Sequence, residues 1–154
     1  MKRKLIVAVA ALPAAVLFAL APIASAGALE SVTFTTTETS IGANAGTFTA
    51  SDAVTDSGTF AADLVAFGAV RSPRVGTGHY LVVFTGAKGS FTLRAQLVFR
   101  PTVDPSVFVD VGRWVIVGGS GAYADLRGEG TLAGVVDFGT GTATGTWQGT
   151  VHSN

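Results

Sequence analysis

The sequence predicts an all-β fold, and three observations predict it. From about residue 31 the chain is rich in threonine, valine, phenylalanine and glycine and poor in glutamate, lysine and leucine, which favours strands over helices. Apolar and polar residues alternate in runs that glycine-containing turns separate. No stretch of ten residues shows the apolar spacing of an amphipathic helix. The runs predict eight strands, near residues 31–38, 46–51, 57–70, 78–86, 89–100, 111–118, 128–138 and 141–152.

The first 26 residues are predicted to be a leader and not part of that fold. Three basic residues at positions 2–4 precede an apolar run over residues 5–23, and Ala24-Ser25-Ala26 is the small-residue pattern that signal peptidases recognise. A retained membrane anchor is the alternative, since the run is near the lower limit for a spanning helix, but two prolines interrupt it. We expect cleavage after Ala26, a single mature domain over residues 27–154, and a secreted or extracytoplasmic location.

Charge and composition exclude several classes of function. The leader holds three of the ten Lys and Arg residues and none of the ten Asp and Glu residues, which leaves the mature chain a net charge of −3. Nucleic acid is disfavoured as a partner because phosphate binding needs a basic face. The chain has no cysteine, which excludes disulfides and thiolate chemistry, and its two histidines are too few for a multi-histidine metal site. We expect no cofactor, no metal and no membrane span after the leader.

Two predicted hairpins assign the inner and outer faces of the sheet. A two-residue turn at Ala87-Lys88 gathers the apolar side chains of its strands on one face: Tyr80, Val82, Phe84, Phe91, Leu93, Ala95, Leu97 and Phe99. A turn at Gly139-Thr140 does the same for Leu132, Gly134, Val136, Phe138, Ala143, Gly145, Trp147 and Val151. The opposite faces carry Arg94, Glu129 and a series of threonines, so the apolar faces are predicted to point inward.

Strands of about twelve residues are long for a sandwich and suit a tilted, closed barrel of eight strands. The interior of such a barrel is filled by side chains or holds one small ligand. Glycines at positions 130, 134, 145 and 149 surround Trp147, and they leave room either for its indole to lie across the sheet, which we favour, or for a cavity. The predicted ligand-binding residues of this interior are Tyr80, Phe84, Phe91, Leu93, Leu132 and Trp147.

Residues 112–130 carry a family resemblance. A predicted strand ends in the corner Gly119-Ser120-Gly121, a short helical turn is expected over 121–127, and Arg127-Gly128 opens the next strand. This pattern is similar to the allene oxide cyclase and dirigent-like β-barrel superfamily, including its bacterial members of unknown function. The likeness extends over about residues 78–151.

The resemblance implies an eight-stranded antiparallel barrel of allene-oxide-cyclase-like, calycin-like type that associates as dimers or trimers through its outer wall. It also implies confinement of an apolar small molecule during a cyclisation or coupling reaction. The catalytic groups of characterised members do not lie in the motif over residues 112–130, so the resemblance gives no residue of this chain a catalytic role.

The remaining polar residues are interpreted as structural. Asp52, Asp56 and Asp104 are expected to form turns, and Asp125 and Arg127 to cap or pair beside the helical turn. Gly118–Gly121 lacks the lysine of a phosphate-binding loop. His79 and His152 are expected to be solvated. In the alternative with the polar face inward, Arg94 and Glu129 would line a pocket, and a buried Glu129 could transfer protons.

Apolar residues also occur on the predicted outer face, at Leu81, Val83 and Val135, and residues 115–117 are apolar on both faces. A strand that is apolar on both faces indicates a cover on the outside. We expect a second subunit, and the alternative cover is the 101–110 loop.

Three functions follow from the sequence: an exported barrel that binds a small apolar molecule, a cyclase- or isomerase-type enzyme that steers such a molecule, and a structural barrel with a filled interior. A cavity with one or two buried polar groups would favour the enzyme, and a purely apolar cavity would favour the binding protein. The sequence alone leaves open whether the protein is catalytic.

Overall fold

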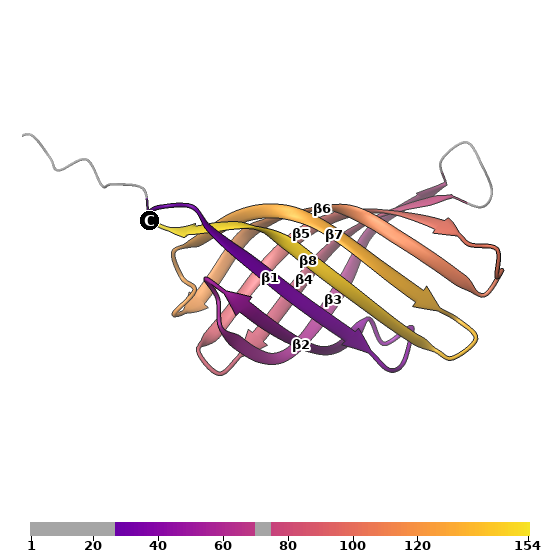
Figure 1. Cartoon of the computed structure of the whole chain (residues 1–154), viewed down its shortest axis with the longest axis horizontal. Coiled ribbons are helices and arrows are strands. Elements are labelled where there is room, and N and C mark those ends of the chain that lie inside the picture. Colours follow the sequence, from indigo (N-terminus) through magenta and orange to yellow (C-terminus); the bar gives the residue numbers. More distant parts are fainter. Residues whose placement is uncertain (1–26, 70–74) are drawn as a thin grey trace, which may run out of the picture.

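Eight strands form a closed antiparallel barrel in which each strand pairs with the next and β1 closes against β8 (Figure 1). The computed structural model describes residues 27–69 and 75–154. The predicted fold class is confirmed. The predicted leader, residues 1–26, and positions 70–74 lie outside the described residues. The strands are β1 (Glu30–Glu38), β2 (Ala45–Asp52), β3 (Asp56–Ala69), β4 (Gly76–Gly86), β5 (Gly89–Pro101), β6 (Val107–Gly121), β7 (Leu126–Asp137) and β8 (Thr142–Ser153).

The predicted strand bounds agree with the structure to within two residues, except for one strand. The sixth was predicted over 111–118 and runs from Val107 to Gly121. The loop predicted from Pro101 begins one residue later, because Pro101 ends β5 and pairs with Phe108. A proline fits there since the end of a strand is where a missing N–H costs least.

The helical turn predicted over 121–127 is wrong. Residues 122–125 form consecutive turns, in which the Tyr123 N–H donates to the Ser120 carbonyl at 3.1 Å and the Leu126 N–H donates to the Tyr123 carbonyl at 3.1 Å. Four residues separate β6 from β7, and they form turns without a helix. Arg127 caps this corner as expected, with its guanidinium donating to the Leu126 carbonyl at 2.8 Å. Along the described ranges, no helix is long and apolar enough to cross a membrane.

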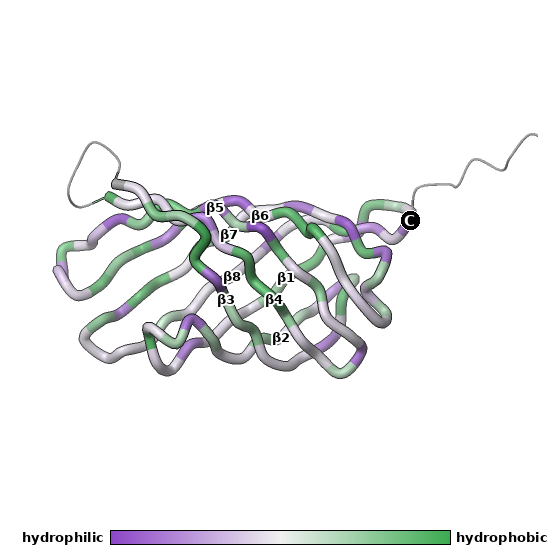
Figure 2. Tube along the Cα trace, turned by 180° about the vertical axis from the view of Figure 1, so that it is seen from behind, coloured by the Kyte–Doolittle hydropathy of each residue, from purple (hydrophilic) through white to green (hydrophobic). Residues whose placement is uncertain are grey.

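Both predicted hairpin registers are confirmed. Phe84 pairs with Phe91 across the first, and Leu132 pairs with Trp147 across the second. The apolar faces point inward and form one core, while Arg94 and Glu129 are exposed on the outside, so the alternative with the polar face inward is excluded. Figure 2 shows the chain changing between apolar and polar colours along the strands.

The two ends of the barrel differ, and they lie left and right in Figure 1. We call the left end, with the β2–β3, β4–β5 and β6–β7 turns, the closed end. We call the right end, with the β1–β2, β5–β6 and β7–β8 loops and the paired ends of β3 and β4, the open end. The described chain also starts and finishes at the closed end, where Gly27 lies against Ser153.

Side chains plug the closed end. Tyr123, Val54 and Leu126 are all buried there, and the Tyr123 ring packs edge-on to Phe91 with 5.4 Å between the ring centroids. Phe91 in turn stacks on Phe84 at 5.0 Å, within a group of phenylalanines that fills the adjoining interior. This half of the barrel is a close-packed core.

Asp56 ties three closed-end segments together. Its carboxylate accepts the Tyr123 hydroxyl at 2.7 Å and the N–H groups of Ala87 and Lys88 at 3.1 and 3.2 Å. It also accepts the N–H of Ser57 at 2.8 Å. These bonds, that from Tyr123 foremost, lower the pKa of the Asp56 carboxyl. Asp56 was expected only to form a turn, whereas its hydrogen bonds to Ala87, Lys88 and Tyr123 join the turns of the closed end.

The outer wall is rich in threonine over β1, β2 and β8, and it carries apolar side chains over β4, β6 and β7. Leu81, Val83 and Val135 are exposed there. The apolar run at 115–117 follows the ordinary alternation of a strand, with Ile116 inside and Val117 exposed, and the β5–β6 register shifts beside it between Thr92 and Leu93. The expected second subunit stays a prediction.

A candidate ligand-binding site at the open end of the barrel

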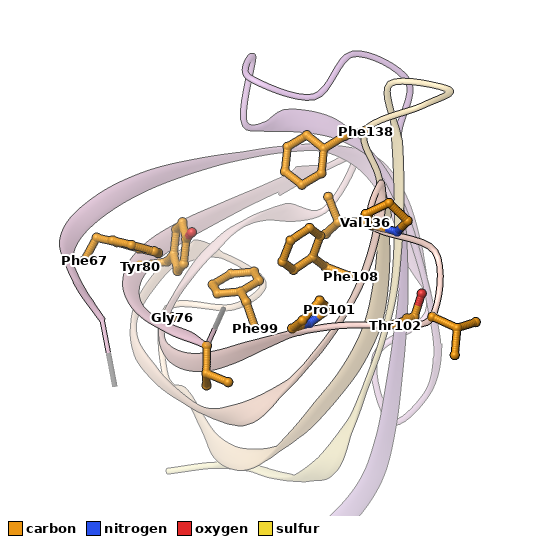
Figure 3. Close-up of a pocket in the computed structure, with 12 residues that line it drawn as sticks. Phe67, Gly76, Tyr80, Phe99, Pro101, Thr102, Phe108, Val136 and Phe138 are labelled. Atoms are coloured by element: carbon orange, nitrogen blue, oxygen red, sulfur yellow. The ribbon is translucent and has the colours of Figure 1, made fainter. Parts of the chain in front are cut away.

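Two adjoining cavities occupy the open end. The outer one measures about 580 Å³ and the inner one about 310 Å³. Figure 3 shows aromatic and aliphatic side chains from several strands converging on the outer cavity. Four residues line both cavities and so join them: Tyr80, Phe99, Val136 and Phe138. The interior of the barrel is therefore filled at one end and hollow at the other.

The rim of the outer cavity is apolar and exposed to solvent. Phe67 and Phe138 are 64% and 60% exposed, and Phe108 packs edge-on to Phe138 with 5.6 Å between the ring centroids. Pro101 and Pro105 contribute to the same rim. Exposed aromatic side chains grouped around a concave opening are typical of a surface that contacts an apolar ligand.

Asp110 is the most unusual residue of the inner cavity. Only 8% of its surface is exposed, and its Oδ1 atom is buried without a hydrogen-bond partner among the described residues. Burial raises the pKa of its carboxyl from 3.8 to about 6. An unpartnered buried carboxylate is costly, so its presence in a core-facing position calls for a function.

Glycines make the space that Asp110 occupies. On the inner face, Asp110 of β6 pairs with Gly134 of β7, which pairs with Gly145 of β8, and Gly145 pairs with Thr36 of β1. A Cβ atom at Gly134 would collide with the Asp110 carboxylate, and one at Gly145 would lie 2.8 Å from the Thr36 hydroxyl. The side chains of Asp110 and Thr36 thus lie over Gly134 and Gly145, and the two glycines add no side chain to the wall.

Three further polar groups share the inner cavity. The Trp147 indole N–H donates to the buried Thr36 hydroxyl at 3.1 Å, and that hydroxyl donates to the Gly145 carbonyl at 3.3 Å. Burial raises the pKa of the Glu38 carboxyl, whose Oε1 is also buried without a partner in the described structure. Burial, and then the charges of Asp110 and Glu38, raise the pKa of the Tyr80 hydroxyl. Asp110, Glu38 and Tyr80 therefore face the same space.

The structure divides the six predicted ligand-binding residues into two groups. Tyr80, Leu132 and Trp147 line the inner cavity. Phe84, Phe91 and Leu93 are fully buried in the filled half, away from the lining of either cavity. The sequence reasoning missed Asp110 and Glu38, although an aspartate at an inward position of β6, two residues before Gly112 and four before Trp114, was a readable signal.

The glycines near Trp147 have different roles from those predicted. A Cβ at Gly130 or Gly149 would lie 2.6 Å from the Trp114 ring, so this pair accommodates Trp114, while Gly145 borders Trp147. The Trp147 indole does pack, with 5% of its surface exposed, and it also forms part of the cavity wall. Both alternatives that the sequence offered are therefore present.

The other candidate residues lie apart from the cavities. His79 is exposed, as expected, whereas His152 is half-buried and its Nδ1 has no partner within the described ranges. Asp104 forms its expected turn by accepting the Ser106 N–H at 2.8 Å. Residues 27–69 and 75–154 contain no cluster of side chains that could hold a metal ion.

In comparisons with known proteins, no family model, no curated protein and no solved structure matches the chain.

Proposed function

We propose that this protein is an exported barrel that binds a small, mainly apolar molecule in its open end. The single observation that carries the proposal is the pair of joined cavities with largely apolar walls, in a barrel whose other half is close-packed. Apolar concave sites with a few polar groups are the usual form of small-molecule sites. The leader-like residues 1–26 support export.

The apolar rim supports the same proposal. Phe67 and Phe138 hold large apolar surfaces in water next to the opening, where a ligand would cover them. Burial of apolar area contributes about 25 cal/mol per Å², so a ligand that covers such rings gains affinity from them. A purely structural barrel would gain nothing from this arrangement.

The test is binding of a neutral fluorescent probe, N-phenyl-1-naphthylamine, whose emission rises in apolar surroundings. We expect saturable binding to the wild-type protein. Ala143→Phe places a ring in the inner cavity and should weaken binding about tenfold or more, because it fills ligand space. Ala133→Phe is the matched control, since Ala133 is exposed on the outer wall of the neighbouring strand. Equal binding by both variants, or no saturable binding at all, would reject the proposal.

A second candidate function is proton transfer in an isomerase- or cyclase-type reaction. It is favoured by one observation, the buried carboxyl of Asp110 with a pKa of about 6 in an apolar cavity, because a general base works best with a pKa near the working pH. The test is deuterium exchange at the carbon next to the carbonyl of decan-2-one, followed by NMR in D₂O. Wild-type exchange that is faster than buffer and that Asp110→Asn abolishes supports this function, and exchange at the buffer rate rejects it.

We also propose membership of the allene oxide cyclase and dirigent-like superfamily. The eight-stranded antiparallel barrel and the Gly119-Ser120-Gly121 corner support it, with Gly121 at a φ of +62°. The turns that replace the expected helical segment are a departure from the pattern of that family. Association into dimers or trimers through the exposed apolar residues of β4, β6 and β7 is part of the same proposal, and sedimentation at micromolar concentrations tests it.

A further inference from the structure

We infer that the ligand of this cavity is an amphiphilic amine, an apolar molecule whose ammonium head group donates hydrogen bonds to Asp110 and Glu38 on the cavity wall. The inference rests on the proposed function and specifies its ligand. The ammonium end of the ligand enters first, and the site rejects apolar molecules with an anionic head group.

Two carboxyl groups on the wall of the inner cavity each have an oxygen atom without a hydrogen-bond donor among the described residues. Asp110 lines the inner cavity and is more than nine-tenths buried, and its Oδ1 lies against Gly134 with no donor among the described residues. Glu38 is half-buried and lines the same cavity; its Oε1 also has no partner among the described residues, while the backbone N–H groups of Ala45 and Asn44 act on the carboxyl to lower its pKa. Buried polar atoms in proteins are nearly always paired, so two unpaired acceptors in one cavity indicate a partner that brings donors. A carboxylate that accepts from an ammonium forms one of the stronger hydrogen bonds available.

Two glycines form the wall of the barrel beside Asp110. Gly134 and Gly145 lie between Asp110 and Thr36 in the inner row, and neither puts a side chain into the space. The Thr36 hydroxyl accepts one bond from Trp147 and donates one to Gly145, which leaves it one free lone pair. Asp110 and Thr36 lie over these glycines, so the cavity wall carries acceptors on both sides, which suits a compact head group with three donors.

The ionisable side chains that line the two cavities include acidic groups and no basic group among the described residues. None of the described residues that line the two cavities is a lysine, arginine or histidine, and the ionisable ones are Asp110, Glu38 and Tyr80. A fatty acid would bring its carboxylate against two other carboxylates in surroundings of low dielectric constant, which is strongly unfavourable. The same charges attract an ammonium. The site therefore discriminates between amphiphiles by the sign of the head group.

The test is displacement of N-phenyl-1-naphthylamine from the wild-type protein by three ten-carbon compounds: decylamine, decan-1-ol and decanoate. At pH 7.5 we expect decylamine to displace the probe at about one-tenth of the decan-1-ol concentration, since charge-assisted hydrogen bonds are roughly twice as strong as neutral ones. Decanoate should be the weakest of the three. The alcohol separates simple donation from the ionic contribution, because it donates without carrying charge.

Two comparisons connect the amine preference to Asp110. Asp110→Asn should remove most of the tenfold advantage of decylamine over decan-1-ol, whereas Asp63→Asn, the same change on the exposed outer face of β3, should leave it intact. In the wild-type protein the advantage should shrink as the pH falls from 7.5 to 5, because Asp110, with a pKa of about 6, takes up a proton over that range. The other titratable groups that face Asp110 are Glu38 of β1 and Tyr80 of β4, and Tyr80 is neutral throughout that range.

The outcomes are distinguishable from failure of the proposed function. If the probe binds and all three compounds displace it equally well, or if decanoate is the best competitor, the cavity binds ligands but the amine inference is wrong. If decan-1-ol matches decylamine and both exceed decanoate, the donor requirement stands and the amine is wrong. If the probe does not bind, the proposed function itself fails.

Discussion

Two aspartates at opposite ends of the barrel illustrate how differently one side chain can be used. Asp56 at the closed end accepts hydrogen bonds from four donors, and its pKa is lowered. Asp110 at the open end accepts none on its buried Oδ1, and its pKa is raised to about 6. The first stabilises the fold, and the second costs stability.

The contrast extends from these residues to the two halves of the interior. Aromatic rings and Tyr123 fill the closed half, while the open half combines cavities with unpaired acceptors. A protein that concentrates its stability in one half can tolerate an unfavourable arrangement in the other, which is typical of functional sites. The following predictions test that division of roles.

The largest effect is expected from matched phenylalanine truncations. Phe84→Ala should cost about 4 kcal/mol of unfolding free energy, because the ring is fully buried among Phe34, Phe48 and Phe91. Phe99→Ala should cost about 1–2 kcal/mol, because Phe99 is partly buried and borders the cavities. Urea unfolding followed by tryptophan fluorescence measures both values. Equal losses would mean that the two halves are packed alike.

The next largest effect is a gain in the free energy of unfolding. Asp110→Asn should stabilise the protein by about 2 kcal/mol at pH 7.5 and by almost nothing near pH 4. The sign follows from the raised pKa: between about pH 4 and 6 the folded state binds more protons than the unfolded state, so stability falls as the pH rises through that window. Urea unfolding of both proteins at the two pH values gives the difference directly. A destabilised variant at pH 7.5 would show that Asp110 has a structural partner.

The opposite behaviour is expected at the closed end. Tyr123→Phe should cost about 1 kcal/mol near neutral pH, because Asp56 loses its shortest hydrogen bond. The pKa of Asp56 is lowered in the folded state, so this stabilisation exists above the unfolded pKa and disappears as acid protonates the carboxylate. Unfolding curves of the two proteins should therefore converge at low pH. A cost that is independent of pH would mean that the hydroxyl acts through packing alone.

The smallest effect is predicted for Glu129→Gln. Glu129 is exposed on the outer wall, so its replacement should change stability by less than about 0.5 kcal/mol and leave probe binding unaltered. Urea unfolding and probe titration measure both quantities. Loss of probe binding would mean that Glu129 belongs to the binding site, although it is exposed on the outer wall of the barrel.

The sequence predicted the barrel because its signals are local and periodic. In the β4–β5 hairpin a single turn at Ala87-Lys88 sets the register of the apolar side chains, and the period of two assigns their faces. The same logic placed Leu132 opposite Trp147 and put Glu129 outside. These features need only neighbouring strands, which the linear chain displays directly.

The candidate site was less accessible from the sequence because it depends on distant strands. The predicted sixth strand began at residue 111, so Asp110 was not assigned to an inward face, although β6 begins four residues earlier. The contacts of Asp56 with Tyr123 and Lys88 join segments that only barrel closure brings together. Whether side chains fill an interior is a property of the whole packing arrangement, so the sequence could offer a cavity only as an alternative.

The meeting of Gly27 and Ser153 at the closed end has a practical consequence. An affinity tag, a fusion partner or a solid support attached directly before Gly27 or after Ser153 lies at the far end of the barrel from the open end, so immobilised protein keeps its cavities accessible. The same proximity makes the fold suited to circular permutation, in which a short peptide joins Ser153 to Gly27 and the chain is reopened elsewhere.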